Sequence, residues 1–284
     1  MRWLKLIFNF YLDASVHVAF AIYALLQVTY QTLNIPSDYH LSIFLFFGSI
    51  SCYNFIKYGV EAEKYIMVAD KYHKGIQFLS FITLSMALYH GFFLSMSTWL
   101  GILGLVLLTG LYAIPVLPNT KNLRSWGGLK IFVVAIVWAG ATVLLPILSA
   151  NQYVAWDVGI EIFQRFILVL VLLVPFEIRD LIYDKVELKT VPQRLGITNT
   201  KIFGGFATLL FFFSTFLKDD LSNEELILKG ILFLTLGWVL FITKRNQSKY
   251  FSSFWVEAIP IFWYGMAILL KGYFNVSPEV ALSF

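Results

Sequence analysis

The feature that most constrains this chain is a series of long apolar blocks in which charged residues are almost absent. A helix of about 20 apolar residues crosses the ~30 Å hydrocarbon core of a bilayer. In lipid only helices and closed barrels satisfy their backbone polar groups, and barrel strands alternate in hydrophobicity over about 10 residues. These blocks do not alternate, and only 13% of the residues are charged, against about 25% in soluble domains. We therefore predict an all-α, polytopic transmembrane helical bundle.

The apolar blocks predict about nine spans of membrane-crossing length. They lie at residues 7–30, 40–58, 75–94, 98–117, 128–149, 159–178, 202–217, 226–243 and 252–270. Arg2 and Lys5 precede the first block as they would in a signal peptide, but the block runs to about Tyr30 and contains Asp13 and His17. We expect it to be a retained span. Because no repeat or linker interrupts the pattern, we expect residues 1–284 to form a single transmembrane domain.

The basic residues predict the orientation of these spans. Of the 21 Lys and Arg residues, 17 fall at the N-terminus or in the loops after spans two, four, six and eight. Only Lys218, Lys229 and Lys271 fall on the opposite side, and Arg165 lies within a span. The positive-inside rule then places the N-terminus in the cytoplasm and the C-terminus outside. This topology accounts for the net charge of +4 without a nucleic-acid partner. Richness in Phe, Ile, Lys, Asn and Tyr points to a bacterial inner membrane.

The densest polar segment is PFEIRDLIYDKVELKTVPQRLG, residues 175–196. Asp180 and Asp184 are four residues apart and share a face if the sixth span continues as a helix. Two carboxylates at this spacing repel each other unless a cation lies between them, and Mg²⁺ typically uses one or two carboxylates together with substrate phosphates. Lys185, Lys189 and other bases surround the pair. The alternative is a solvated helix end with ordinary salt bridges.

This segment resembles the second aspartate-rich motif of the UbiA superfamily of intramembrane prenyltransferases. The matching elements are Asp180-x-x-x-Asp184, Lys189-Thr190, Pro192 and Arg194-Leu195-Gly196, and they are most similar to the menaquinone-pathway branch. A second similarity covers residues 111–140, where Tyr112, Lys121, Arg124 and Lys130 occupy the places of the family's Tyr…Lys-Arg loop. The resemblance implies nine transmembrane helices with the catalytic loops on the cytoplasmic side.

The family's first motif, Asn-Asp-x-x-Asp-x-x-x-Asp, is degenerate in this chain. The second span ends in NFIKYGVEAEKY, so that Asn54 is present but Phe55, Tyr58 and Ala62 stand at the aspartate positions. In the family these aspartates hold Mg²⁺ and the diphosphate. Glu61 or Glu63 replaces a carboxylate ligand in our interpretation, with Lys57 as a direct phosphate partner. Loss of the chemistry is the alternative.

Ionisable residues inside the spans are the remaining candidates, because such groups are costly in lipid and usually face the bundle interior. Asp13 and His17 are four apart on the first span and can face the same way, as site lining or as structure. Glu161 and Arg165 on the sixth span have the spacing of an internal ion pair. Glu257 lies near a span end and was expected to reach the interface.

The resemblance implies a Mg²⁺-dependent prenyltransferase that moves an isoprenyl group from a prenyl diphosphate to a lipophilic, aromatic acceptor. Asp180 and Asp184 are the expected catalytic metal ligands, with Glu61 as a weaker third. The expected substrate-binding residues are Asn54, Lys57, Tyr112, Lys121, Arg124, Lys189 and Arg194. One alternative is a non-catalytic protein of the same fold that binds a prenyl lipid or a protein partner. A small-solute transporter is a further alternative, although the broken helices and repeats of that class are not evident.

Overall fold

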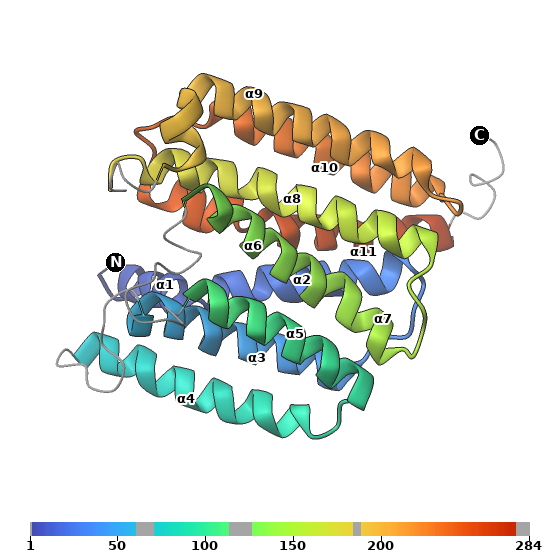
Figure 1. The fold of residues 1–284 in the computed structure, drawn as a ribbon, viewed down its shortest axis with the longest axis horizontal. Coiled ribbons are helices and arrows are strands. Elements are labelled where there is room, and N and C mark those ends of the chain that lie inside the picture. Colours follow the sequence, from blue (N-terminus) through green and yellow to red (C-terminus); the bar gives the residue numbers. More distant parts are fainter. Residues whose placement is uncertain (1, 61–70, 114–126, 184–188, 277–284) are drawn as a thin grey trace.

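The computed structural model describes residues 2–60, 71–113, 127–183 and 189–276, and every regular element in these ranges is a helix (Figure 1). The first half contains α1 (Arg2–Asp13), α2 (Val16–Thr32), α3 (Tyr39–Asn54), the π-helical η1 (Phe55–Val60), α4 (Lys71–Gly91) and α5 (Met96–Ala113). The second half contains α6 (Gly127–Ala139), π-helical η3 (Gly140–Leu144), α7 (Leu145–Ser149), α8 (Trp156–Asp180), α9 (Val191–Phe213), 3₁₀-helical η5 (Ser214–Leu217), α10 (Asn223–Ile242), π-helical η6 (Phe251–Val256) and α11 (Ile259–Val276). The predicted all-helical fold class is confirmed.

The helices lie side by side in one bundle, and their order follows the predicted spans (Figure 1). Within the described ranges, six helices are long and apolar enough to cross a membrane on their own, and the bent pair α1–α2 makes up to seven. α4 and α5 occupy the places of the third and fourth predicted spans without meeting that test. They are joined by the short turn that the sequence predicts, since α4 ends at Gly91 and α5 begins at Met96.

The first predicted span is not one straight helix. α1 and α2 meet at an angle of 56°, and Ser15 between them has the left-handed φ of 60°, which a continuous helix does not contain. The expectation that Asp13 and His17 share a helical face is therefore wrong. His17 instead contacts the hydroxyl of Tyr11 at 2.7 Å and the carbonyl of Phe254 at 2.9 Å.

α2 and α8 occupy the middle of the bundle. α2 packs against α3 and α11, and α8 packs against α6, α9 and α10. The largest apolar core combines these helices, with Leu25 and Val28 from α2, Leu168 and Val171 from α8, and Leu232 from α10. The outer helices leave large apolar side chains exposed, as lipid-facing surfaces do; on α4 these include Phe78 and Phe81.

Small residues bring the fourth and fifth predicted spans into close contact. A Cβ atom added to Gly101 would lie 2.7 Å from the side chains of Leu145 and Leu148, and one added to Gly140 would lie 2.6 Å from Leu105. Small residues at helix interfaces are typical of membrane bundles because they let backbones approach.

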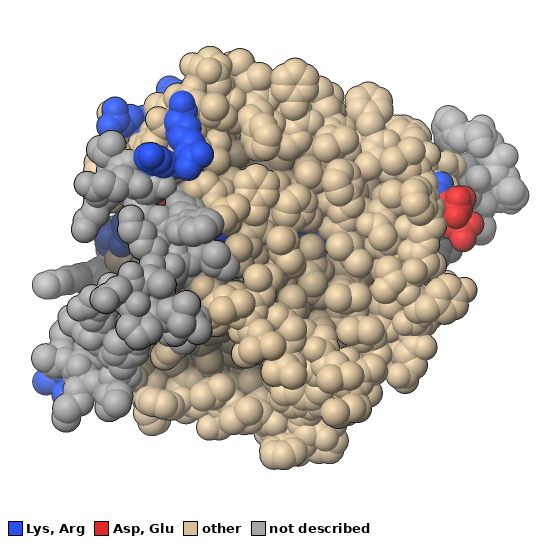
Figure 2. Space-filling model, viewed as in Figure 1, with Lys and Arg blue, Asp and Glu red and all other residues tan. Residues whose placement is uncertain are grey.

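The charged side chains gather at the two ends of the bundle. In the view of Figure 2, a wide band almost free of Lys, Arg, Asp and Glu separates a basic end from an end where Asp and Glu are visible. The start of α1, the end of α8 and the start of α9 lie at the basic end, whereas the turns between α4 and α5 and between α9 and α10 lie at the other (Figure 1). The predicted separation of basic loops from neutral turns is thus present in the fold.

Candidate site at the basic end of the bundle

The second aspartate-rich segment begins where α8 ends. Pro175 lies inside this helix, and its carbonyl accepts a hydrogen bond from Gln247 Nε2 at 2.9 Å. Arg179 Nε donates to Asp180 Oδ1 at 2.8 Å, and both side chains are about one quarter exposed, at 28% and 24%. The second carboxylate oxygen of Asp180 makes no hydrogen bond or ion pair with any residue in the described ranges. Asp180 therefore has one carboxylate oxygen at the basic end that makes no contact with a described polar group.

The helix does not continue through Asp184 as the spacing argument assumed. α8 ends at Asp180, and residues 181–183 form a turn in which Tyr183 N donates to Asp180 O at 2.8 Å. Asp184 itself lies outside the described residues, so the pairing of the two carboxylates stays a prediction.

The basic residues after the aspartates form the start of α9. Lys189 is exposed and has a left-handed φ of 51°, a conformation that is uncommon for residues with a Cβ atom. Arg194 Nε donates to the carbonyl of Lys189 at 2.8 Å, and Thr190 N donates to Gln193 Oε1 at 3.0 Å. α9 is interrupted at Gly196, whose φ of 77° and ψ of 165° suit glycine. In the Arg194-Leu195-Gly196 sequence, the glycine thus allows the break in the backbone, which follows the exposed bases Lys189 and Arg194.

α6 reaches the same end of α8 through an ion pair. Lys130 Nζ lies 3.2 Å from Glu177 Oε1, and the Glu177 side chain is only 3% exposed. Lys130 belongs to the segment that resembles the family's basic loop, and Glu177 belongs to the second aspartate-rich segment. The structure therefore brings the two resembling segments together.

The residues of the degenerate first motif contact the bend between α1 and α2. Asn54, which is 3% exposed, donates through Nδ2 to the carbonyl of Ala14 at 3.0 Å. Lys57 Nζ and Tyr58 OH donate to the carbonyl of Asp13 at 3.2 and 2.9 Å. A bend frees backbone carbonyls that an uninterrupted helix would pair, and these three side chains satisfy them. Asn54, Lys57 and Tyr58 thus stabilise the bend by donating hydrogen bonds to it.

The Asp13 carboxylate at the bend also lies close to a residue of the first motif. Asp13 Oδ1 lies 3.9 Å from Lys57 Nζ, and its Oδ2 accepts a hydrogen bond of 2.8 Å from Tyr72 OH. Tyr72 precedes the predicted third span, and desolvation, reinforced by the hydrogen bond to Asp13 and by its charge, raises the Tyr72 pKa above its ordinary value. Sequence reasoning singled out Asp13 as an intramembrane carboxylate but did not connect it with Lys57.

Glu257 is a carboxylate that sequence reasoning placed near a span end without connecting it to either motif region. It follows π-helical η6, and segments of this kind are frequent at functional sites. Its side chain is partly exposed and makes no hydrogen bond or ion pair within the described ranges. Lys57 and Arg179 both lie within electrostatic range of it. The available sequence signal was a lone carboxylate in an apolar block.

Several predicted site residues fall outside the described part of the chain. These are Glu61, Lys121, Arg124 and Asp184, together with the side chain of Tyr112. Within the described ranges, no group of three or more His, Cys, Asp or Glu side chains is arranged to hold a metal ion. Among the described candidates, one carboxylate oxygen of Asp180 and the buried Oδ1 of Asn54 have no hydrogen-bond partner in the described part of the chain.

The structure is similar to solved structures of intramembrane proteins. A UbiA homolog from Archaeoglobus fulgidus bound to GPP and Mg²⁺ matches with a TM-score of 0.61 at 13% identity, over 92% of this chain and 99% of that one. The same homolog bound to Cd²⁺ matches with a TM-score of 0.64 at 13% identity, over 92% and 98%. A digeranylgeranylglyceryl phosphate synthase structure matches with a TM-score of 0.53 at 14% identity, over 95% and 97%.

No protein-family model and no curated protein matches the sequence. The likeness to the solved structures concerns the fold, because the identities are low. The chain has the UbiA fold, and the fold that the two motifs implied is thereby confirmed.

Proposed function

We propose that this chain is a UbiA-type prenyltransferase that transfers an isoprenyl group from a prenyl diphosphate to a lipophilic, aromatic acceptor in the presence of Mg²⁺. The observation that carries the proposal is the contact between the basic segment 111–140 and the second aspartate-rich segment 175–196 at one end of a UbiA fold. There Asp180 exposes a carboxylate oxygen beside Arg179, and Lys130 reaches α8. Structural neighbours were solved with GPP and Mg²⁺ or with DMAPP and Mg²⁺, which supports the same substrate class.

The carboxylates available as metal ligands suit one magnesium ion better than two. Mg²⁺ prefers oxygen ligands and uses one or two carboxylates plus substrate phosphates, which Asp180 and Asp184 would supply. When bound, the ion would neutralise charge on the departing diphosphate. At the first motif, Phe55, Tyr58 and Ala62 replace the family's aspartates, and Lys57 lies among them and beside the Asp13 carboxylate. We assign Lys57, Lys189 and Arg194 to direct contact with phosphate. Asn54 and Glu61 remain proposed ligands of a weakened second position.

The reaction would break the C1–O bond of the prenyl diphosphate, with the electron pair leaving on the diphosphate. The allylic cation would then form a carbon–carbon bond with the acceptor ring, which loses a proton. An apolar bundle excludes water that would otherwise quench the cation. Aromatic faces stabilise cations, and Tyr53, which accepts a 2.6 Å hydrogen bond from Trp138 Nε1 in the core, is a candidate for this role.

The test is a turnover assay on the purified full-length chain with labelled prenyl diphosphates of several lengths and a panel of aromatic acceptors. We expect a prenylated product that depends on Mg²⁺ and disappears in Asp180→Asn. Lys249→Gln, an exposed change in the loop before η6, is the matched control and should retain activity. Absence of product with every pair, in protein that still binds prenyl diphosphate, would contradict the enzymatic proposal.

A non-catalytic prenyl-lipid-binding protein is the second candidate, because a specific observation favours it. Asn54 and Lys57, at the degenerate first motif, donate to backbone carbonyls at the α1–α2 bend. A protein of this kind would bind the prenyl chain with the same affinity in Mg²⁺ and in chelator. The enzyme should bind a prenyl diphosphate more tightly with Mg²⁺, and comparing the two affinities distinguishes the candidates.

We further propose that the basic end faces the cytoplasm and that residues 1–284 act as one transmembrane domain, in a bacterial inner membrane. The gathering of basic residues at the end of α8 and the start of α9 supports this orientation through the positive-inside rule.

A further inference from the structure

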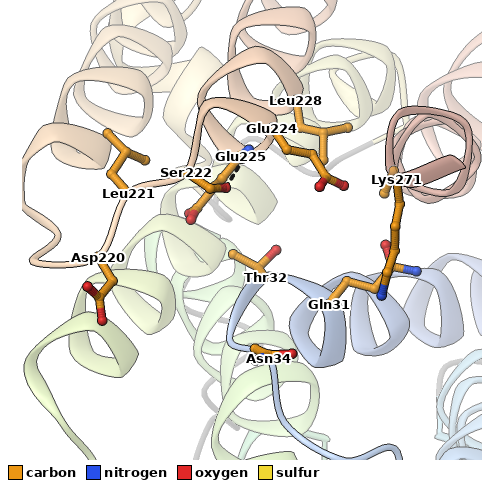
Figure 3. Close-up of a pocket in the computed structure, with 11 residues that line it drawn as sticks. Gln31, Thr32, Asn34, Asp220, Leu221, Ser222, Glu224, Glu225, Leu228 and Lys271 are labelled. Carbon is orange, nitrogen blue, oxygen red and sulfur yellow. Dashed lines mark hydrogen bonds between the residues drawn. The ribbon is translucent and has the colours of Figure 1, made fainter. Parts of the chain in front are cut away.

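A second polar cavity lies at the end of the bundle opposite to Asp180. Its volume is about 490 Å³, within the range of about 300–1,000 Å³ that is usual for small-molecule sites. It is bordered by the end of α2, the start of α10 and the last turns of α11 (Figure 3). Eight of the eleven residues that line it are polar or charged, and the charged ones are Asp220, Glu224, Glu225 and Lys271.

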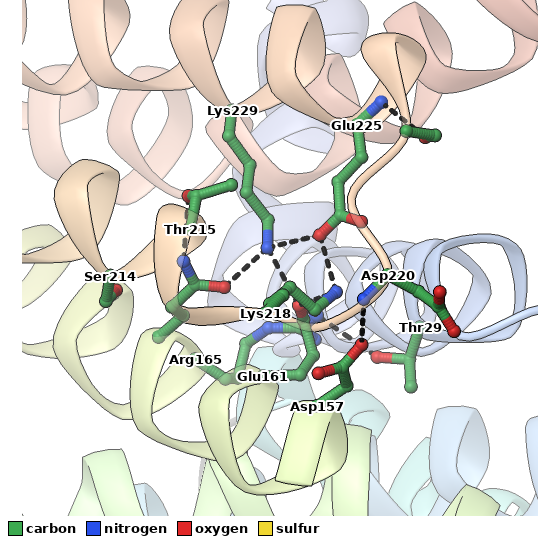
Figure 4. A network of polar contacts seen from close by, with 12 residues as sticks. Thr29, Asp157, Glu161, Arg165, Ser214, Thr215, Lys218, Asp220, Glu225 and Lys229 are labelled. Atoms are coloured by element: carbon green, nitrogen blue, oxygen red, sulfur yellow. Dashed lines mark hydrogen bonds and ion pairs between the residues drawn. The ribbon is translucent and has the colours of Figure 1, made fainter.

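Glu225 forms the fixed part of the cavity wall. It is 6% exposed, and its Oε1 lies 2.6 Å from both Lys218 Nζ and Lys229 Nζ (Figure 4). Its N–H also donates to Ser222 Oγ, the N-cap of α10, at 3.1 Å. Glu225 Oε2 has no hydrogen bond or ion pair with any described residue and is not fully buried. A carboxylate oxygen is therefore held in place with one face open to the cavity.

Three further charged side chains line the same cavity, the carboxylates of Asp220 and Glu224 and the ammonium group of Lys271. Glu224 is partly exposed and the other two are exposed, and none of the three side chains has an ion pair or hydrogen bond within the described ranges. Gln31 adds an acceptor, because its buried Oε1 has no hydrogen-bond partner in the described part of the chain. The cavity thus presents carboxylate oxygens from α10 and from the turn before it, a buried unsatisfied acceptor on α2, and a single ammonium group from α11.

This distribution of charge selects a class of ligand. A primary ammonium group donates three hydrogen bonds, as a lysine ammonium does, and charge-assisted bonds to carboxylates are about twice as strong as neutral ones. Glu224, Glu225 Oε2 and Gln31 Oε1 are the acceptors for such a group. Lys271 can then form an ion pair with an anionic group on the same ligand. A zwitterion with a primary amine and a phosphate fits both halves, whereas a choline group has no N–H to donate.

The position of the cavity favours a lipid as the source of this zwitterion. It lies where helices of a membrane bundle end, which is the level of lipid headgroups. Ile227 on α10 and Ile268 and Leu269 on α11 are 43%, 49% and 67% exposed, so the two helices that border the cavity also offer apolar surface to acyl chains.

We propose that this cavity binds the headgroup of a phospholipid that carries a primary amine. The ammonium group contacts Glu224 and Glu225, and the phosphate contacts Lys271. The site is separate from the candidate prenyl diphosphate site, and its occupation does not depend on whether the chain is an enzyme.

The test measures binding to purified, delipidated protein in a maltoside detergent, by native mass spectrometry and by the shift in melting temperature. The probes are dihexanoyl phosphatidylethanolamine, phosphatidylcholine and phosphatidylglycerol, and phosphoethanolamine without acyl chains. We expect the phosphatidylethanolamine probe to bind most tightly. Glu224→Gln and Lys271→Gln should each weaken its binding by about tenfold or more, since each removes a charge-assisted contact. Lys249→Gln, at the basic end, is the matched control and should bind as the parent does.

Equal binding of the three lipids, or unchanged phosphatidylethanolamine binding in both cavity variants, would overturn the proposal. Tighter binding of phosphatidylglycerol would overturn it in favour of an anionic lipid. Phosphoethanolamine binding as tightly as the lipid would overturn the assignment to a membrane source. Because Glu224 and Lys271 make no described contacts, their variants are expected to fold as the parent does, and their unliganded melting temperatures verify this.

Discussion

Removal of the Glu161 charge is the most informative perturbation of this fold. Glu161 is 1% exposed and lies near the start of α8 between three cations (Figure 4). Its Oε1 is 3.2 Å from Arg165 Nη2, and its Oε2 is 3.0 Å from Lys229 Nζ and 3.7 Å from Lys218 Nζ. Glu161→Gln keeps the size of the side chain but leaves Glu225 as the only carboxylate in direct contact with these lysines among the described residues.

The expected cost follows from these distances. At an effective dielectric constant of about 20, a pair of unit charges 3.0–3.2 Å apart attracts by about 5 kcal/mol, and desolvation of the ions offsets much of this. Breaking a buried pair by removing one partner costs about 3–5 kcal/mol, because the other charge stays buried without compensation. Three cations share Glu161, so we expect a loss at the upper end of that range. At about 2 °C per kcal/mol for a chain of this size, the melting temperature falls by about 8–10 °C.

The assay is unfolding of the purified protein in detergent, followed by intrinsic tryptophan fluorescence. Glu224→Gln, the matched control, lies in the same region but has no described partner and should change stability by less than about 0.5 kcal/mol. Lys229→Met in the Glu161→Gln background removes one of the two lysines that then share Glu225, which lowers the excess of buried positive charge, and should restore part of the lost stability. A loss below about 1 kcal/mol in Glu161→Gln, or a further loss in the double variant, would refute the view that this carboxylate holds the cluster together.

Three other outcomes are expected. Asp180→Asn should abolish the Mg²⁺-dependent part of prenyl diphosphate binding in calorimetry while costing only about 0–1 kcal/mol of stability, as partly exposed pairs do; retained binding would contradict its assignment as a metal ligand. Asn54→Ala should lower the free energy of unfolding by about 1–3 kcal/mol, because it leaves a buried carbonyl at the α1–α2 bend without a donor; unchanged stability would show that the bend does not need it. Single cysteines in residues 57–74 and 179–201, in a Cys52→Ser background, should both react with an impermeant reagent from the cytoplasmic face, and labelling from opposite faces would end the shared-site model.

The positions of the helices and the separation of charge could be predicted from the sequence because both are local properties. A span must be apolar for its whole length, whichever neighbours it packs against. Blocks such as residues 159–178 and 226–243 therefore correspond closely to α8 and α10. The ion pair of Glu161 and Arg165 was also predictable, since residues four apart on one helix lie on the same face.

The sequence could suggest the family resemblance, but it did not determine what the degenerate motif does. The residues after Asn54 were candidates for binding substrate, and nothing local indicated that the chain bends at Ser15. The bend exposes backbone carbonyls that Asn54, Lys57 and Tyr58 then satisfy. These contacts join residues about 40 positions apart, and their formation depends on how α1, α2 and α3 are rotated against one another.

Only the tertiary structure decided which charged groups share a site. Lys218 and Lys229 belong to a different part of the sequence from Glu161, yet they meet it in the core. Glu257 likewise lies within electrostatic range of Lys57 and Arg179, which come from other parts of the sequence. Hydropathy determines that a segment crosses the membrane, but the direction in which each polar side chain points is determined by helix rotation and packing. Those depend on contacts between distant spans, because buried charges are stable only where such contacts supply a partner.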